Sequence, residues 1–278
     1  MVITSSIALD QQLSLLRKDK IIGFVPTMGA LHEGHLSLVQ QAKADSDVVV
    51  VSIFVNPTQF NNPDDLKNYP RDTETDIKKL TLAGADIIFI PAEKEIYPQP
   101  DTRVFDFGAM DKVMEGFYRP GHFNGVAQVV DRLFNIVQPH VAFFGEKDFQ
   151  QLAIVNALVA QEQLPVRIVS CPIVREPDGL AMSSRNLLLS ATQRAHAPLI
   201  YKTLQAAAEK VSNTTIPALA TWIQTTIDAD AELETEYVEI VDAHSLQPIN
   251  EWTAAEHIQL CVAVYMRPIR LIDNIRLK

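Results

Sequence analysis

Two histidines flank a glutamate and a glycine in His32-Glu33-Gly34-His35, and this segment follows an apolar run that ends at Val25. An amphipathic pattern begins directly after it, so we predict a strand-to-helix turn here. The spacing of the histidines puts both imidazoles on one face of a first helical turn, whose N–H groups could receive an anion. Gly34 carries no side chain and lets a flat ligand approach the backbone. A pair of capping or solvent-exposed histidines is the alternative that this segment alone leaves open.

Two further stretches carry amide, guanidinium and imidazole groups. Asn56 and Gln59 follow the second apolar run, where their amides could bind a carboxylate or a hydroxyl group, although an ordinary loop has the same composition. Arg119 and His122 lie where a helical pattern begins, so the guanidinium could bind an anion, or the segment could be an exposed turn. Each stretch alone is a weak indication of a site.

Two more stretches could bind phosphate. Lys147 follows Gly145 at another predicted strand-to-helix turn, and lysine is a compact charge suited to phosphate, but a surface cluster of Glu, Lys and Asp explains this stretch equally well. The loop 182–185 offers two hydroxyls and a guanidinium near a predicted domain boundary. Loops of that kind can close over phosphates.

The positions of the glycines and the absence of known nucleotide-binding motifs narrow the kinds of ligand site that the sequence predicts. Six of the ten glycines lie in or beside these stretches, namely Gly29, Gly34, Gly121, Gly125, Gly145 and Gly179. The chain has no GxxxxGK[ST] loop and no GxGxxG after a strand, so neither a P-loop nor a dehydrogenase-type dinucleotide fold is supported. Its carboxylates form no cage for a metal. We therefore predict no metal held by the protein itself, and any Mg²⁺ would arrive with nucleotide phosphates.

Apolar segments rich in Val, Ile and Phe alternate with amphipathic segments through the first 175 residues. The predicted strands are 21–25, 48–55, 86–90, 141–144 and 166–174. The predicted helices between them are 34–44, 72–83, 122–137 and 148–163. This alternation predicts right-handed crossovers and a Rossmann-like, doubly wound parallel sheet, in which ligands bind beyond the carboxyl ends of the strands.

The pattern changes in the last hundred or so residues. Helical patterns cover 190–212 and 216–229, and strand patterns cover 236–241, 258–265 and 271–277. Helices followed by strands predict a smaller α+β domain with an antiparallel sheet. We therefore predict an α/β domain over residues 1–175 and a C-terminal α+β domain over residues 176–278.

Composition and charge exclude several classes of protein. The 278 residues are 47% hydrophobic and 21% charged, as in a globular protein, and the net charge of -10 argues against an extended nucleic-acid surface. The N-terminus lacks a signal peptide pattern, and the longest apolar run, 48–55, is too short to span a bilayer, so we expect a soluble cytoplasmic protein with no membrane partner. Cys171 and Cys261 lie in apolar runs without ligand spacing, which favours buried reduced thiols over a disulfide or a zinc site.

Six motifs occur in a fixed order: PTMGALHEGH, VSIFVNPTQF, YPRD, YRPGHFNGV, FGEKDFQQL and VREPDGLAMSSRN. Together, from about Phe24 to Leu189, they closely resemble the pantoate–β-alanine ligase family. His32–His35 resembles the HIGH signature of the nucleotidyltransferase superfamily, and Met182–Arg185 resembles its KMSKS loop. Phe149 stands where the family often has tyrosine, and residues 190–278 are less distinctive.

The resemblance implies a two-step, ATP-dependent ligation in pantothenate and coenzyme A biosynthesis. The pantoate carboxylate attacks the α-phosphorus of ATP to give pantoyl adenylate and pyrophosphate, and the amine of β-alanine then releases AMP and pantothenate. Mg²⁺ would accompany the nucleotide phosphates. The resemblance also implies a homodimer and a C-terminal domain that acts as a lid.

The resemblance assigns roles residue by residue. It implies ATP-binding roles for Met28, Gly29, Ala30, Leu31, His32, Glu33, Gly34, His35, Gly145, Glu146, Lys147, Asp148, Val174, Met182, Ser183, Ser184 and Arg185. It implies substrate-binding roles for Gln59, Gln151, Asn56, Arg119 and His122. The predicted catalytic residues are His35, as proton donor, with His32, Lys147 and Arg185, which can stabilise charge that develops at phosphorus.

Two other functions fit part of this pattern. A nucleotidyltransferase that leaves the nucleotide on its product, such as a cytidylyltransferase, would share the HIGH-like motif. A non-catalytic nucleotide sensor could keep the fold, but it would have little reason to retain His35, Lys147 and Arg185 together.

Overall fold

The computed structural model describes residues 1–278, which form two compact units. The first unit contains Met1–Phe107, Arg119–Glu146 and Gln151–Pro172, and the second contains Gly108–Tyr118, Lys147–Gln150 and Ile173–Lys278. Each unit has its own cluster of buried apolar side chains. The division into folding domains at residue 175 stays a prediction.

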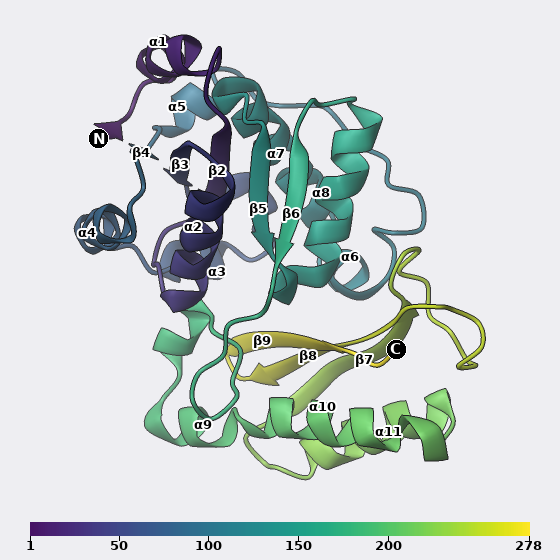
Figure 1. The fold of residues 1–278 in the computed structure, drawn as a ribbon. Coiled ribbons are helices and arrows are strands. Elements are labelled where there is room, and N and C mark those ends of the chain that lie inside the picture. The colour runs from purple at the N-terminus through teal and green to yellow at the C-terminus, as the bar shows by residue number, and fades with distance from the viewer. The chain divides into compact units, whose positions relative to one another are not determined.

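A parallel sheet of six strands forms the centre of the first unit (Figure 1). Its strands are β1 (Val2–Ile3), β2 (Ile22–Thr27), β3 (Val48–Ile53), β4 (Ile87–Phe89), β5 (Val141–Gly145) and β6 (Arg167–Cys171), in the order β1-β4-β3-β2-β5-β6. All six positions of β3 are buried, because helices cover both faces of the sheet. This explains why the central strands are continuous apolar runs rather than alternating patterns.

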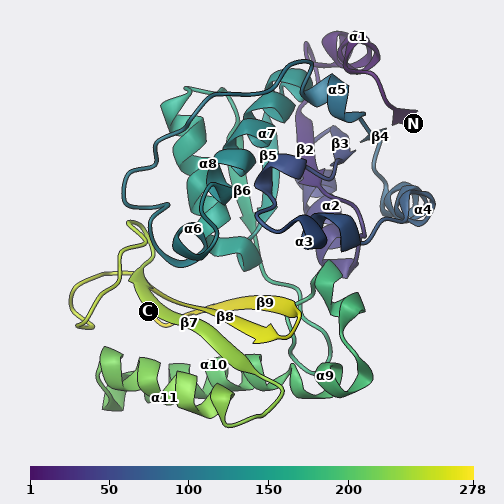
Figure 2. The same ribbon diagram turned by 180° about the vertical axis from the view of Figure 1, so that it is seen from behind.

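Helices pack on the two faces of this sheet. They are α1 (Ser6–Leu16), α2 (Glu33–Asp45), α3 (Pro63–Asn68), α4 (Thr73–Ala83), α5 (Glu93–Ile96), α7 (His122–Val137) and α8 (Phe149–Gln161), whose first two residues belong to the second unit. Figure 1 shows α2 in front of the sheet and α7 and α8 behind it, and Figure 2 shows α7 and α8 from the other side. The predicted doubly wound α/β architecture is confirmed.

The direction of chain crossover reverses between β2 and β5. From β2 the chain moves through α2 to β3 and through α4 to β4, whereas from β5 it moves through α8 to β6 on the opposite side. Because β2 and β5 are neighbours in register, their carboxyl ends lie on either side of a topological switch point. Ligands of open α/β sheets bind at such points.

An antiparallel sheet and two helices form most of the second unit, as predicted. The sheet pairs β7 (Glu234–Asp242), β8 (Ile258–Met266) and β9 (Ile269–Arg276) in that order. Alternate residues of β8, such as Leu260 and Val262, join side chains of α10 (Leu199–Lys210) and α11 (Ile216–Asp228) in one apolar cluster. The remaining helices are α6 (Met114–Tyr118) and α9 (Ala191–His196).

Two sequence-based boundaries were wrong. The single helix predicted over 190–212 is divided into α9 and α10, and Pro198 stands at the junction, because proline in a helix interior lacks the N–H donor and clashes with the preceding turn. The strand predicted over 166–174 ends at Cys171, and residues 172–174 instead lead into a hairpin. The predictions also missed β1 and four short or weakly amphipathic helices, α1, α3, α5 and α6.

No helix of the chain is both long enough and apolar enough to cross a membrane.

Candidate active site

The turn between β2 and α2 has an unusual backbone. Gly29 and Ala30 both have positive φ angles, of 82° and 50°. A Cβ atom on residue 29 would lie 2.9 Å from Oδ2 of Asp76, so both the conformation and the space require glycine there. The turn thus carries the chain from the sheet into α2 through a path that few sequences allow.

Asp76 and Lys79 of α4 hold this turn. The carboxylate of Asp76, 2% exposed, accepts the backbone N–H of Ala30 and of Leu31, each at 2.8 Å. Nζ of Lys79 donates to the carbonyl oxygen of Leu31 at 2.5 Å. Since residues 76 and 79 lie on one face of α4, a single helix holds both the N–H groups and the carbonyl of the turn. Sequence reasoning missed this pair, although Asp76 follows the YPRD motif closely.

His32 and His35 form a reciprocal cap at the start of α2. Nδ1 of His32 accepts the backbone N–H of Gly34 at 3.2 Å, and Nδ1 of His35 accepts the backbone N–H of His32 at 3.3 Å. The two rings lie 4.0 Å apart between centroids. An imidazole nitrogen that accepts a hydrogen bond carries no proton, so the neutral form of both rings has its proton on Nε2. The pair therefore presents two N–H donors from one helix start.

This geometry corrects one detail of the sequence-based prediction. His32 is the N-cap rather than a residue of the first turn, and the imidazole of His32 accepts the Gly34 N–H. The His35 N–H donates to the carbonyl of His32 at 2.8 Å. The alternative interpretation of the two histidines as capping residues is thus correct for their Nδ1 atoms. An anion at this helix start would meet Nε2–H groups instead of those two backbone N–H groups.

Asn56 and Gln59 belong to a buried amide network after β3. Nδ2 of Asn56 donates to Oε1 of Gln59 and to the carbonyl oxygen of Gly125, both at 3.0 Å, and Oδ1 accepts the hydroxyl of Tyr97 at 2.8 Å. Nε2 of Gln59 lies 3.3 Å from Sδ of Met28, which follows β2. A Cβ at residue 125 would lie 2.3 Å from the carbonyl oxygen of Thr58, so glycine lets α7 approach this loop. The network fixes the orientation of both amides.

Arg119 and His122 join the same network from the start of α7. Nδ1 of His122 donates to the carbonyl oxygen of Gln59 at 2.8 Å, which leaves Nε2 as the acceptor of the Arg119 guanidinium at 3.2 Å. His122 is buried, and Arg119 is half-buried. Hydrogen bonds of the first unit thus connect four predicted substrate-binding residues, Asn56, Gln59, Arg119 and His122, and Gln59 also contacts Met28, a predicted ATP-binding residue. Their roles stay predictions.

Gly145 ends β5, and the short helix Glu146–Asp148 follows it. Nζ of Lys147 lies 3.6 Å from a carboxylate oxygen of Asp148, and the lysine side chain is only 19% exposed. The Lys147 carbonyl accepts Nδ2 of Asn274 from β9 at 2.9 Å. Gln151 is half-buried in the first turn of α8, and Glu33 is exposed at the start of α2.

The residues 174–185 form a hairpin followed by a short helix. The Met182 N–H donates to the carbonyl of Val174 at 3.0 Å, and residues 175 and 181 form an antiparallel bridge. Oγ of Ser183 caps the helix Ser184–Leu188 by accepting the backbone N–H of Arg185 at 3.3 Å. Ser184 is buried, whereas Ser183 and Arg185 are half-buried.

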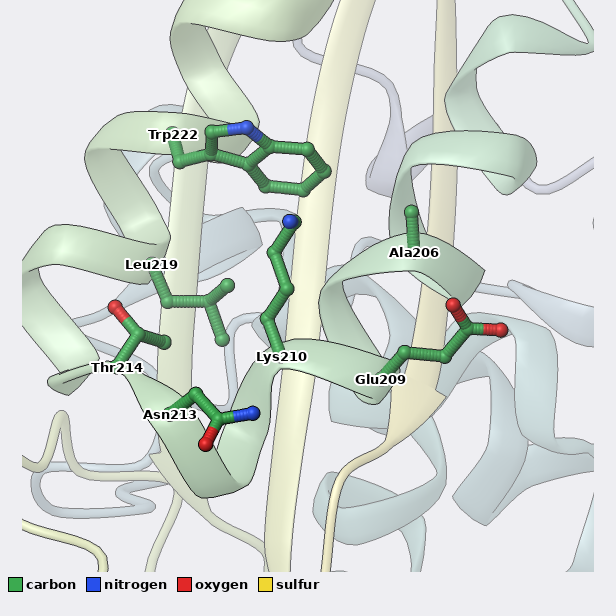
Figure 3. Close-up of a pocket in the computed structure, with 7 residues that line it drawn as sticks. All are labelled: Ala206, Glu209, Lys210, Asn213, Thr214, Leu219 and Trp222. Atoms are coloured by element: carbon green, nitrogen blue, oxygen red, sulfur yellow. The ribbon is translucent and has the colours of Figure 1, made fainter.

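A surface pocket of the second unit contains none of the predicted site residues. It is lined by the end of α10 and the start of α11, where Nζ of Lys210 lies 4.7 Å from the ring centroid of Trp222 (Figure 3). Both cysteines are buried and free, and burial raises the pKa of the Cys171 thiol to about 11. No three His, Cys, Asp or Glu side chains are grouped so that they could hold a metal ion.

A family model described as pantoate-beta-alanine ligase matches residues 1–276. The chain belongs to this family. It is 52% identical over 257 residues to a pantothenate synthetase of Porphyromonas gingivalis ATCC 33277, with 92% of each chain covered. It is 49% identical over 271 residues to a pantothenate synthetase of Bacteroides fragilis YCH46, with 97% of this chain and 96% of the relative covered. The chain is therefore an enzyme with pantoate–β-alanine ligase function, and the resemblance carried by its motifs is confirmed.

Solved structures agree with the family assignment. The pantothenate synthetase of Thermus thermophilus matches with a TM-score of 0.93 and 41% identity, over 99% of both chains. A pantoate-beta-alanine ligase of Francisella tularensis matches with a TM-score of 0.84 and 37% identity, over 100% of this chain and 97% of its own. The Francisella enzyme was solved in complex with beta-gamma ATP and beta-alanine.

Proposed function

We propose that the enzyme condenses pantoate with β-alanine at the expense of ATP, through a pantoyl adenylate that is never attached to the protein. The observation that carries the proposal is the reciprocal cap of His32 and His35, in which both Nδ1 atoms accept backbone N–H groups at the start of α2, in the turn that follows β2. The ATP complex of the Francisella relative supports ATP as a substrate here. The products are pantothenate, AMP and pyrophosphate.

The first step joins the pantoate carboxylate to the α-phosphorus. A carboxylate oxygen forms the new P–O bond while the bond to the pyrophosphate oxygen breaks, so negative charge grows on the phosphoryl and leaving oxygens. A carboxylate is already ionised at pH 7, and no base is required. Nε2–H of His32 and His35 would donate to these oxygens, because preorganised donors lower the barrier most where charge develops.

Lys147 and Arg185 are the further positive charges that we propose to bind the phosphates, as the family resemblance implies. Lys147 is a half-buried ammonium, and Arg185 is the second residue of the short helix Ser184–Leu188, which Ser183 caps. Gly145 to Asp148, Val174 and Met182 to Arg185 are the proposed nucleotide contacts beyond Met28 to His35. We expect Lys147→Ala to cost about 2.7–4 kcal/mol of transition-state stabilisation, as the loss of one charge-stabilising donor does.

The amide network of the first unit is the proposed pantoate site. Asn56 uses both N–H groups of its amide and its Oδ1 within the network, and it fixes the Gln59 amide through Oε1. The Gln59 amide can then bind hydroxyl and carboxylate oxygens of the substrate. Arg119 and His122 support this loop through the Gln59 carbonyl, and Gln151 is proposed to complete the site. In the second step the β-alanine amine attacks the acyl carbon, and the bond from that carbon to the AMP oxygen breaks.

Mg²⁺ fits this proposal as a companion of ATP rather than as a resident of the protein. The proposed nucleotide contacts include three carboxylates, Glu33, Glu146 and Asp148, but no three His, Cys, Asp or Glu side chains are grouped so that they could hold the ion. Bound to the phosphates, Mg²⁺ would neutralise part of their charge. Every other contribution comes from the side chains named above.

Pyrophosphate exchange tests the mechanism. With ATP, Mg²⁺ and pantoate but no β-alanine, labelled pyrophosphate should enter ATP, because a free adenylate forms without the amine. Arg185→Ala should slow this exchange if its guanidinium contacts the phosphates. Exchange that requires β-alanine would exclude a free adenylate, and a product that keeps the nucleotide would favour the cytidylyltransferase-like alternative.

The predicted homodimer and cytoplasmic location stay predictions, carried by family resemblance. Sedimentation velocity of the purified chain tests the first, and fractionation of cells that express it tests the second. A monomer at micromolar concentration would remove the dimer from the proposal without affecting the chemistry.

A further inference from the structure

Two consecutive polar residues are buried in strand β9. Asp273 is 4% exposed and Asn274 is 3% exposed. Burial of a carboxylate and an amide is costly unless each is hydrogen-bonded, so their partners explain why the strand contains them. Because consecutive strand residues point to opposite faces of a sheet, the two side chains serve different partners.

Asn274 is fixed by contacts on both of its amide atoms. Its Oδ1 accepts Nε2 of Gln259, itself buried, at 2.7 Å, and this sets which way the amide faces. Its Nδ2 then donates to the backbone carbonyl of Lys147 at 2.9 Å. The contact lies on the main chain of the residue whose ammonium is the proposed phosphate ligand.

Asp273 is bound to the base of the hairpin that leads to Ser183 and Arg185. Its two carboxylate oxygens accept the guanidinium of Arg175 at 2.7 and 2.9 Å. The same guanidinium donates to the Gly179 carbonyl at 3.1 Å and stacks 3.5 Å from the ring centroid of Tyr201.

Gly179, in the turn of the hairpin, packs tightly against Tyr201. A Cβ there would lie 2.6 Å from Tyr201, and the φ angle of 96° also requires glycine, so the hairpin turn fits tightly beside the stacked ring. The hairpin is thus fastened to β9 through a bidentate ion pair and to α10 through Tyr201.

We propose that Asp273 and Asn274 are positioning residues for adenylation. Through them, strand β9 holds both the Lys147 backbone and the base of the 174–185 hairpin in place. The inference rests on the proposed function, because it explains how two of the proposed nucleotide contacts, Lys147 and the hairpin, are held in place. Phosphoryl transfer depends chiefly on positioning, so a small loosening of the Lys147 backbone reduces the rate without removing any group that touches substrate.

The test is a double-mutant comparison by pantoate-dependent pyrophosphate exchange. Asn274→Ala is measured in the wild-type background and in the Lys147→Ala background. We expect about a tenfold lower exchange rate in the first, the size of one lost positioning hydrogen bond, with the KM for pantoate unchanged. In the second background we expect no further loss, because the ammonium that Asn274 positions is already gone.

Two further variants separate positioning from loss of stability. Leu271→Val, in the apolar core on the same strand, is the matched control, and it should lower thermal stability without the background-dependent loss of exchange. Asn274→Asp keeps an acceptor for Gln259 and removes the donor to Lys147, so it tests the same contact if Asn274→Ala does not fold.

The outcomes are distinct. Wild-type exchange by folded Asn274→Ala or Asn274→Asp overturns the inference and leaves the proposed function intact. An equal loss in both backgrounds also overturns it, since that pattern indicates general destabilisation. Absence of exchange in the wild-type enzyme removes the proposed function, and the inference with it.

Discussion

The carboxylate of Asp76 in α4 accepts the backbone N–H of Leu31 at 2.8 Å, in the turn that leads to the two histidines. The partner is a main-chain group that is buried, and it would lose this acceptor once the carboxylate was removed. A residue more than forty positions away in sequence therefore decides the path of the chain into α2.

Asp76→Ala is expected to lower the free energy of unfolding by about 1–3 kcal/mol, because it takes the carboxylate acceptor away from the buried N–H groups of Ala30 and Leu31. Adenylation should fall as well, since His32 follows the turn directly. Denaturant titration and pyrophosphate exchange measure the two effects. Asp72→Ala in the same α4 region is the control: it removes the N-cap contact to Thr75, so it should cost stability with little change in exchange. Equal exchange by the two variants would contradict the role of Asp76.

The two nitrogens of His35 can be tested separately. His35→Asn retains an acceptor close to the position of Nδ1 and loses the Nε2–H donor, whereas His35→Ala loses both. We expect both variants to lower the adenylation rate by roughly 10²–10⁴, but only His35→Ala to lose the cap and its stability of about 1 kcal/mol. Single-turnover adenylation and thermal melts provide the readouts. A variant His35→Asn with normal adenylation would show that the side chain is a cap alone.

Substrate selection should depend on the amide network. Gln59 is 9% exposed, its Oε1 accepts Nδ2 of Asn56, and its Nε2 lies 3.3 Å from Sδ of Met28, so its amide is held in one orientation, in which we expect it to bind polar atoms of pantoate. A pantoate analogue without its hydroxyl groups should have a kcat/KM lower by a factor of roughly 10⁴, the order seen when a site built for hydrogen bonds receives an analogue that lacks them. Steady-state kinetics with the two acids measure this ratio. Comparable kcat/KM values would remove Gln59 from the selectivity argument.

The pair His196 and Asp230 predicts a pH dependence of stability. Nδ1 of His196 donates to Asp230 at 2.6 Å, and this hydrogen bond raises the pKa of His196 above its usual value near 6.5 while it lowers the pKa of Asp230. A raised histidine pKa contributes stability that is complete below about pH 6.5 and is lost as the pH rises through the folded value. We expect the wild-type melting temperature to fall across that range more than that of Asp230→Asn.

An NMR titration gives the direct check on this pair. The His196 resonance should titrate above about pH 6.5 in the wild-type enzyme and move toward that value in Asp230→Asn. Identical His196 titrations in both proteins would contradict the prediction.

The amino-acid pattern predicted the fold class correctly, and it put the candidate site residues near the ends of predicted strands and the starts of predicted helices. Runs such as Val48–Val51 are apolar at every position because both sheet faces are covered, so short apolar runs between amphipathic segments predicted five of the six parallel strands. Gly29 and the polar residues that follow the predicted strands marked turns at the carboxyl ends of the strands, whereas Gly125 lies within α7, where it allows close approach to the loop after β3. These features are local, and local features can be read from spacing and residue type.

The contacts that hold those residues depend on the folded structure. Asp76 reaches Leu31 across 45 positions, and Asn274 reaches Lys147 across 127, and no periodicity links such pairs. The use of Nδ1 by both caps likewise depended on ring orientation, which sequence does not specify. Hydrogen bonds between distant segments depend on chain geometry that arises after the elements pack, and for that reason the positioning residues became visible only in the folded molecule.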